Sequence, residues 1–106
     1  MKFYALVGPT AVGKTALSIA LAQQIDAEII SCDSMQVYRG MDIGTAKATV
    51  EERKIVLHHM IDIVDPDVSF TVADYQRMAR EEILRLNQNG KPALLVGGTG
   101  LYYQAL

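Results

Sequence analysis

Residues 8–15, Gly-Pro-Thr-Ala-Val-Gly-Lys-Thr, constrain the fold of this 106-residue chain more than any other segment. They match the pattern G-x-x-x-x-G-K-[ST], the P-loop, in which a glycine-rich turn joins a β-strand to an α-helix. The surrounding sequence agrees, because an apolar run at 3–7 precedes the segment and a helical pattern from Lys14 to Ile25 follows it. Gly8 and Gly13 let the backbone turn tightly and approach a ligand closely. We therefore predict a strand–loop–helix unit that binds a diphosphate or a triphosphate.

The residue types of the P-loop predict how it would hold phosphate. Its backbone N–H groups would point at the ligand from the start of a helix, where the helix dipole favours negative charge. Lys14 supplies a cation for the phosphate oxygens, and the Thr15 hydroxyl can hold Mg²⁺. A glycine-rich turn without a ligand is the alternative. The predicted phosphate-binding residues are Gly8, Pro9, Thr10, Ala11, Val12, Gly13, Lys14 and Thr15.

The composition indicates one globular domain. Half of the residues are hydrophobic and 21% are charged, which excludes a disordered chain. The net charge of −2 lacks the basic excess that usually accompanies nucleic-acid binding. Cys32 is the only cysteine, so no internal disulfide can form, and the first apolar run is too short to span a membrane. We expect a monomeric cytoplasmic protein without a membrane partner.

A carboxylate follows the second predicted strand, Glu28–Ser31. Strand, helix and second strand together predict a right-handed βαβ unit. Because ligands bind at the carboxyl ends of the strands in open parallel sheets, Asp33 is expected to share one crevice with the P-loop. An equally open alternative is that Asp33 and Ser34 form a turn or a helix cap. Cys32 is predicted to be a small buried side chain rather than a nucleophile.

The middle of the chain predicts a short helix and the start of a strand. Residues 49–57 carry a weakly amphipathic pattern, and an alternating pattern begins at His59. A metal site at His58 and His59 is the less favoured alternative, because neighbouring side chains of a strand point to opposite faces. Asp65-Pro66-Asp67 predicts a turn.

The C-terminal part predicts one more helix and one more strand. Thr71 and Asp74 match a capping box that opens a helix, and Gly90 suits its C-terminal end. The apolar strand Ala93–Val96 follows. It leads into Gly97-Gly98-Thr99-Gly100, where the backbone is expected to approach a ligand or another strand closely.

Together these elements predict an α/β fold of the P-loop NTPase type, with a parallel sheet between helices on both faces, in three layers. Residues 101–106 begin a helix that is too short to be stable alone in water. The fold is therefore expected to be truncated after its fourth strand.

With these residues placed, the chain resembles the tRNA dimethylallyltransferase (tRNA isopentenyltransferase) family. Four of the five matching segments are far more specific than the P-loop alone, and all five follow the family order. If the resemblance holds, residues 1–106 are the N-terminal part of a P-loop-containing catalytic domain, without the C-terminal remainder of the family's longer chains. The segments are Gly8–Thr15 (GPTAVGKT), Ile30–Tyr38 (ISCDSMQVY), Gly40–Lys47 (GMDIGTAK), His58–Ile63 (HHMIDI) and Gly97–Tyr102 (GGTGLY).

The resemblance implies an enzyme that transfers a dimethylallyl group from dimethylallyl diphosphate to the exocyclic N6 amine of an adenosine next to the tRNA anticodon. Asp33 would then be the general base. Thr10 and Lys14, with Mg²⁺ held at Thr15, would stabilise the charge that develops on the departing diphosphate. The residues that would contact tRNA are Asp33, Ser34, Met35, Gln36 and Thr99.

The resemblance also implies that important parts lie outside these 106 residues. The remainder of the family's chain carries an arginine that helps to hold the diphosphate and most of the basic surface that binds tRNA. Electrostatic affinity for nucleic acid needs such cations. We therefore expect this chain by itself to have little transferase activity and weak tRNA affinity.

Three other functions stay open. A small-molecule kinase of the P-loop type also places an acidic residue after its second strand, but it would consume ATP. An enzyme that prenylates free adenine nucleotides differs in the missing C-terminal region. A non-catalytic phosphate-binding module would lose nothing measurable when Asp33 is replaced by Asn.

Overall fold

The structure, a computed structural model, describes residues 3–7, 14–32, 36–40 and 48–97, with the backbone alone at residues 7, 14 and 15. Its elements alternate between strands and helices, as the sequence predicts. In chain order they are β1 (Phe3–Val7), α1 (Lys14–Ile25), β2 (Glu28–Ser31), α2 (Val50–Ile55), β3 (His58–His59), α3 (Val72–Gln88) and β4 (Ala93–Gly97).

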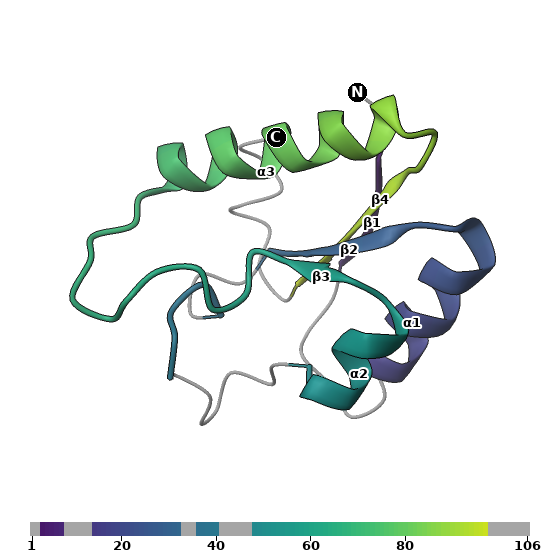
Figure 1. Cartoon of the computed structure of the whole chain (residues 1–106), viewed down its shortest axis with the longest axis horizontal. Coiled ribbons are helices and arrows are strands. Elements are labelled where there is room, and N and C mark those ends of the chain that lie inside the picture. Colours follow the sequence, from purple (N-terminus) through teal and green to yellow (C-terminus); the bar gives the residue numbers. More distant parts are fainter. Residues whose placement is uncertain (1–2, 8–13, 33–35, 41–47, 98–106) are drawn as a thin grey trace.

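The four strands form one parallel sheet in the order β1-β4-β2-β3. α3 covers one face of the sheet, and α1 and α2 lie on the other (Figure 1). This arrangement confirms the predicted three-layer α/β fold. β4 is last in the sequence but lies between β1 and β2, so the first two strands along the chain are not neighbours in the sheet.

Two apolar segments are more exposed than their sequences indicate. The apolar run at β1 is typical of a central strand, yet among the described residues β1 lies at the edge of the sheet, with Tyr4 47% exposed. α1 is apolar nearly all round, which is typical of a buried helix, and it buries Ser18, Ile19 and Ala22 but leaves Leu17 57% exposed. Both differences have one cause: an apolar side chain does not show whether another element covers it.

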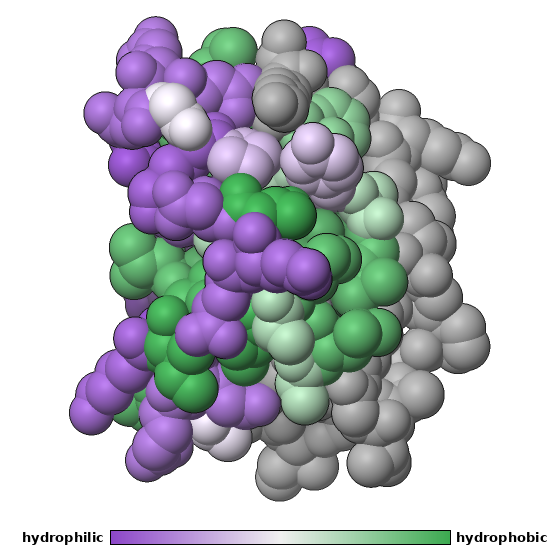
Figure 2. Space-filling model, turned by 90° about the vertical axis from the view of Figure 1, so that its right-hand side faces the viewer, coloured by the Kyte–Doolittle hydropathy of each residue, from purple (hydrophilic) through white to green (hydrophobic). Residues whose placement is uncertain are grey.

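Apolar surface therefore remains on the outside of the described chain. Figure 2, which views the side at the right of Figure 1, shows apolar surface in the middle of that face, with hydrophilic side chains to its left and above it. The large hydrophobic side chains that are exposed are Tyr4, Leu17, Val50, Ile55, Leu57, Val68, Val72 and Leu84.

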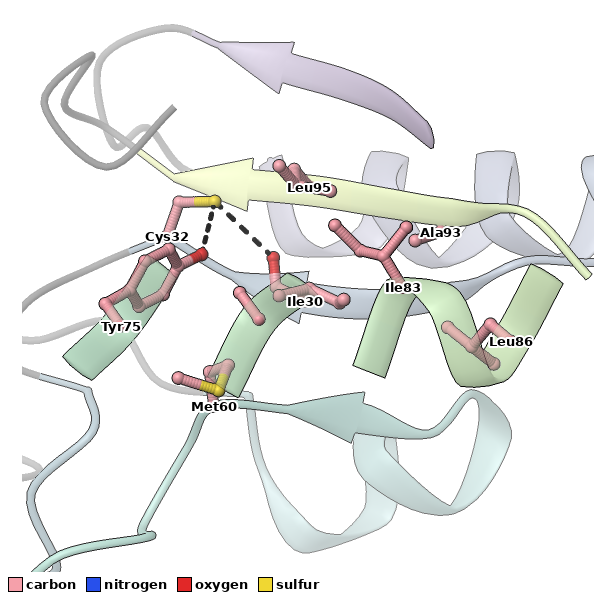
Figure 3. Close-up of a cluster of buried hydrophobic side chains, with 9 residues drawn as sticks. Ile30, Cys32, Met60, Tyr75, Ile83, Leu86, Ala93 and Leu95 are labelled. Carbon is pink, nitrogen blue, oxygen red and sulfur yellow. Dashed lines mark hydrogen bonds between the residues drawn. The ribbon is translucent and has the colours of Figure 1, made fainter. Parts of the chain in front are cut away.

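The core consists of one hydrophobic cluster on each face of the sheet. Neighbouring residues of a strand point to opposite faces, so Ile29 and Leu94 serve the α1 side while Ile30 and Leu95 serve the α3 side. The α1-side cluster contains Ile19, Ala22, Ala27, Ile29, Val56 and Leu94. The α3-side cluster contains Ile30, Cys32, Met60, Tyr75, Ala79, Ile83, Leu86, Ala93 and Leu95 (Figure 3).

Local sequence signals explain where α3 begins and ends. The Thr71 hydroxyl accepts the N–H of Asp74, and the Asp74 carboxylate accepts the N–H of Thr71, which confirms the capping box. Gly90 has a φ of 77°, and its N–H donates to the Asn87 carbonyl. The next N–H donates to the Leu86 carbonyl, so a Schellman motif ends the helix.

The middle of the chain holds shorter elements than predicted. α2 spans Val50–Ile55 and begins with a second capping box, which Thr49 and Glu52 form from a T-x-x-E sequence. β3 is confirmed at His58–His59 but ends there, because Met60 has a φ of 67° that no strand residue adopts. Within the part of the chain that the structure describes, no helix is long and apolar enough to cross a membrane.

Candidate functional site

The carboxyl ends of β1, β4 and β2 lie side by side at one edge of the sheet. Val7 is opposite Gly97, and Ser31 is opposite Val96. Neighbouring strands are about 4.8 Å apart, so the ends of β1 and β2 lie about 10 Å apart, with β4 between them. The described chain thus reaches this edge directly before residues 8–13 and 98–100, and Cys32 follows β2 directly before residues 33–35. The predicted shared crevice itself lies outside the described residues.

Most predicted site residues lie outside the described residues. Lys14 and Thr15 form the start of α1, where only the backbone is described. Gln36 is the one predicted site residue with a described side chain. The predicted residues outside the described ranges are Gly8, Pro9, Thr10, Ala11, Val12, Gly13, Asp33, Ser34, Met35 and Thr99.

The start of α1 must lie near the same edge. α1 ends at Ile25, three residues before the start of β2 at the opposite edge, and its 12 residues rise about 18 Å back toward the carboxyl ends of the strands. The seven steps from Val7 to Lys14, which span at most about 25 Å, allow this position. The first N–H groups of a helix have no partner within the helix and carry the positive end of its dipole. The described backbone therefore places an anion-attracting helix start within reach of the ends of the strands.

A hydrogen-bond network surrounds the end of β2; it is buried at Tyr75 and part-buried at Gln36. The Ser31 hydroxyl donates to Gln36 Oε1 at 2.7 Å, across the segment that contains Asp33. From α3, the Tyr75 hydroxyl donates to the Ser31 carbonyl at 2.9 Å and lies 2.9 Å from the Cys32 sulfur. Ser31 and Tyr75 were not predicted as site residues; the only signal was a hydroxyl at the end of an apolar strand and another in an apolar helix stripe.

Cys32 is completely buried, as predicted, and its N–H donates to the Val96 carbonyl at 2.9 Å. Gly97 lies directly against it. A Cβ added at Gly97 would lie 3.0 Å from the carbonyl carbon, the oxygen and the Cβ of Cys32. The predicted need for close approach is therefore confirmed at Gly97, where the neighbour is the adjacent strand. Gly98 and Gly100 lie outside the described residues.

We expect Gly97→Ala to destabilise the 106-residue chain by about 1–3 kcal/mol, because the new methyl group must push β4 away from backbone atoms of Cys32. Urea unfolding measures the loss, and amide hydrogen exchange at Cys32 locates it. Gly40→Ala is the matched control: its Cβ would meet nothing within 4 Å, so any cost comes from its φ of 76° alone. Unchanged exchange at Cys32 in Gly97→Ala would contradict the predicted contact.

The segment after Gln36 is attached to residues 62–64. The Gln36 carbonyl accepts the N–H of Asp62 at 2.9 Å, and the Val37 carbonyl accepts the N–H groups of Ile63 and Val64 at 2.8 and 3.0 Å. The Asp62 carboxylate in turn accepts from the Arg53 guanidinium at 2.9 Å. Backbone and ion-pair contacts thus fix the position of the chain directly after residues 33–35.

His58 and His59 have separate partners. His58 Nδ1 lies 2.7 Å from the Val56 carbonyl, and burial, the largest influence, lowers the pKa of His58 and so favours the neutral ring. His59 Nε2 lies 2.6 Å from Glu28, and its Nδ1 lies 3.4 Å from Glu82. Among the described residues, no three His, Cys, Asp or Glu side chains form a group that could hold a metal ion.

Comparison with known proteins gives one consistent family. The family model described as IPP transferase matches residues 36–106. The chain is similar to a tRNA dimethylallyltransferase from Syntrophomonas wolfei, with 62% identity over 105 residues; the match covers 99% of this chain and 34% of that protein. The chain therefore spans about a third of the length of the curated relatives that it matches.

Solved structures give the same result. The full-length tRNA isopentenylpyrophosphate transferase from Bacillus halodurans matches with a TM-score of 0.92 and 59% identity, over 98% of this chain and 34% of that one. A eukaryotic dimethylallyltransferase, described as acting on tRNA, matches with a TM-score of 0.91 and 37% identity, over 99% of this chain and 26% of that one.

Proposed function

The chain belongs to the IPP transferase family, and from this we propose that the protein acts as a tRNA dimethylallyltransferase. It would transfer the dimethylallyl group of dimethylallyl diphosphate to the N6 amine of an adenosine next to the anticodon. We propose that it does so in the cytoplasm as a monomer. Names of relatives support the transferase activity and tRNA as the substrate.

The register of the sheet is the structural observation that supports this reaction most. The segments that carry the P-loop and Asp33 leave the sheet at the same edge, with one strand between them. A diphosphate bound at the start of α1 and a base carried after β2 could then serve one reacting carbon. Such an arrangement converts a reaction between two substrates into one within a single complex, which contributes much of the rate of many enzymes.

We propose that Asp33 accepts a proton from the adenosine amine. The N6 nitrogen attacks the first carbon of the dimethylallyl group, the bond from this carbon to the diphosphate oxygen breaks, and N6 gives one proton to the Asp33 carboxylate. The products are N6-dimethylallyl adenosine and diphosphate. The free amine is barely acidic, so the base helps only as positive charge develops on nitrogen.

The P-loop would hold the diphosphate as it leaves. Lys14, Thr10 and the backbone N–H groups of residues 8–15 would stabilise the negative charge that develops on it. We propose that the Thr15 hydroxyl is a ligand of Mg²⁺, since hydroxyl and phosphate oxygens are ligands that this ion prefers. When bound, Mg²⁺ supplies further positive charge beside the diphosphate.

The residues after β2 would hold the adenosine. An enzyme that modifies a base must take it out of its stack, which costs a few kcal/mol and least in a loop. The residues proposed to contact the tRNA are Asp33, Ser34, Met35, Gln36 and Thr99.

The test uses this chain continued with the C-terminal remainder of the Bacillus halodurans relative, which we name the extended protein. Single-turnover assays with an anticodon stem-loop RNA and dimethylallyl diphosphate should yield N6-dimethylallyl adenosine and diphosphate. A protein that instead consumes ATP with a hydroxyl acceptor, or that prenylates free adenine nucleotides but no RNA, would contradict the proposal.

We expect the 106-residue chain alone to show little or no transfer, because the chain carries a net charge of −2 and lacks two thirds of its relatives' length. Its affinity for RNA should also be weak, since phosphate contacts by Lys and Arg dominate such binding. The measurement compares this chain with the extended protein at equal concentration. Equal single-turnover rates would contradict the expectation.

A further inference from the structure

The hydrogen bonds on either side of residues 33–35 have a consequence for the proposed reaction. We propose that Ser31, Gln36 and Tyr75 are positioning residues, which hold the two ends of this segment and thereby aim the Asp33 carboxylate. This inference rests on the proposed function. It concerns a second role for Gln36, which is also proposed to contact the tRNA, and a role for Ser31 and Tyr75 that acts through the backbone rather than on the substrate.

The first contact closes the segment. The Ser31 hydroxyl donates to Gln36 Oε1 at 2.7 Å, so residues 32–35 lie within a ring closed by two side chains. Ser31 itself is only 3% exposed, and its bond to Gln36 is part-buried. This bond links the residues on either side of the segment and so limits how far apart they can lie.

The second contact fixes the N-terminal end of the segment. The N–H of Ile29 donates to Leu57, so the backbone of Ser31, two residues further along the strand, also faces the β3 side. However, β3 pairs only with Ile29 and Ile30. The Tyr75 hydroxyl, which lies 2.9 Å from the Ser31 carbonyl, supplies the hydrogen bond at the position where the strand pairing stops.

Tyr75 is held firmly in place. It is completely buried in the α3-side cluster, and Figure 3 shows its ring below Cys32, with the hydroxyl directed at the end of β2. The Cys32 sulfur lies 2.9 Å from that hydroxyl. Tyr75 shares this cluster with apolar side chains that include Ile30 and Ala79. A buried tyrosine normally satisfies its hydroxyl, and here the partner is the backbone of the proposed site.

The third contact fixes the C-terminal end. The Gln36 carbonyl accepts from Asp62, and the Val37 carbonyl accepts from Ile63 and Val64. Ser31, Gln36 and Val37, which lie on either side of residues 33–35, are thus bonded to α3 and to residues 62–64. Because a displacement of about 1 Å in a reacting group can cost about 100-fold in rate, such bonds matter for a general base.

The test is a double-mutant cycle in the extended protein with Ser31→Ala, Gln36→Met and both together. Each single variant should lower the single-turnover rate of transfer about tenfold at saturating substrates, with the Kd for dimethylallyl diphosphate unchanged. The double variant should be no slower than the singles, because both remove the same bond. The Kd for RNA shows whether Gln36 also contacts the tRNA: if it does, Gln36→Met raises this Kd and Ser31→Ala does not.

A second variant covers the case in which Ser31→Ala fails to fold. Tyr75→Phe keeps the buried ring and removes only the hydroxyl, and it should also lower the rate about tenfold. Ile83→Val is the matched control: it removes one methyl group from the same cluster and the same helix, eight residues or about 12 Å along α3 from Tyr75. It should lower the melting temperature to a similar degree and leave the transfer rate unchanged.

Amide hydrogen exchange of residues 33–36 tests the positioning role independently of the proposed function. Ser31→Ala and Tyr75→Phe should speed exchange there about tenfold, whereas Ile83→Val should not. If the unmutated protein transfers no dimethylallyl group but exchange changes as expected, the function is wrong and the positioning stands. If transfer occurs and the single variants leave rate and exchange unchanged, or their rate effects multiply, the positioning role is wrong.

Discussion

Asp33→Asn in the extended protein is expected to slow dimethylallyl transfer by about 100-fold to 10,000-fold, which is the usual contribution of a general base. The amide has the shape of the carboxylate but cannot accept the proton that the N6 amine gives up. Binding of dimethylallyl diphosphate should not change, because the diphosphate is proposed to lie in the P-loop. Single-turnover rates and the Kd for the diphosphate measure the two effects separately.

Asp67→Asn is the matched control for this substitution. Asp67 lies in the exposed turn between β3 and α3, where the Val68 N–H donates to the Asp65 carbonyl. The same loss of one negative charge there should leave the rate unchanged. An Asp33→Asn protein with the rate of the unmutated protein would contradict the proposed base and would favour a phosphate-binding module.

Lys14→Met in the extended protein should lower the transfer rate by about 100-fold to 1,000-fold, the typical cost of one preorganised electrostatic group. Methionine keeps the length of the side chain and the helix propensity at the start of α1 but removes the charge. The cation is proposed to act mainly on charge that develops as the diphosphate leaves. The rate should therefore fall more than the affinity for dimethylallyl diphosphate.

Lys54→Met removes the same charge from the opposite edge of the sheet. Lys54 lines a hollow of about 330 Å³ together with Ala27 and Glu28, at the start of β2. This control should transfer the dimethylallyl group at the normal rate. A similar loss in both variants would show a general effect of net charge and would contradict a specific role of Lys14.

The secondary structure of this chain could be predicted in large part from local signals. Apolar runs, the capping box at Thr71 and Gly90 at the end of α3 depend on neighbours in sequence, so they are visible without a fold. The sequence patterns fail to indicate features that depend on residues distant in the sequence. The edge position of β1 and the exposure of Leu17 both depend on what packs against them.

The residues of the candidate site also fall into two groups: those that a local sequence pattern indicates and those that only the fold brings together. The P-loop and Asp33 could be named from their motif and from their place after predicted strands. Ser31 and Tyr75 could not, because 44 residues separate the two partners of their hydrogen bond. The same holds for Gly97, whose close approach to Cys32 depends on the pairing of β4 with β2.

The sequence by itself predicts which residues are proposed to bind phosphate and to accept a proton, and it predicted the strands and helices beside them, because both predictions depend on chemistry within a few residues. Only the tertiary structure decided that β4 lies between β1 and β2 and that Tyr75 supports the end of β2. Strand order and buried hydrogen bonds result from packing between distant segments, since each buried polar group must find a partner wherever the fold supplies one.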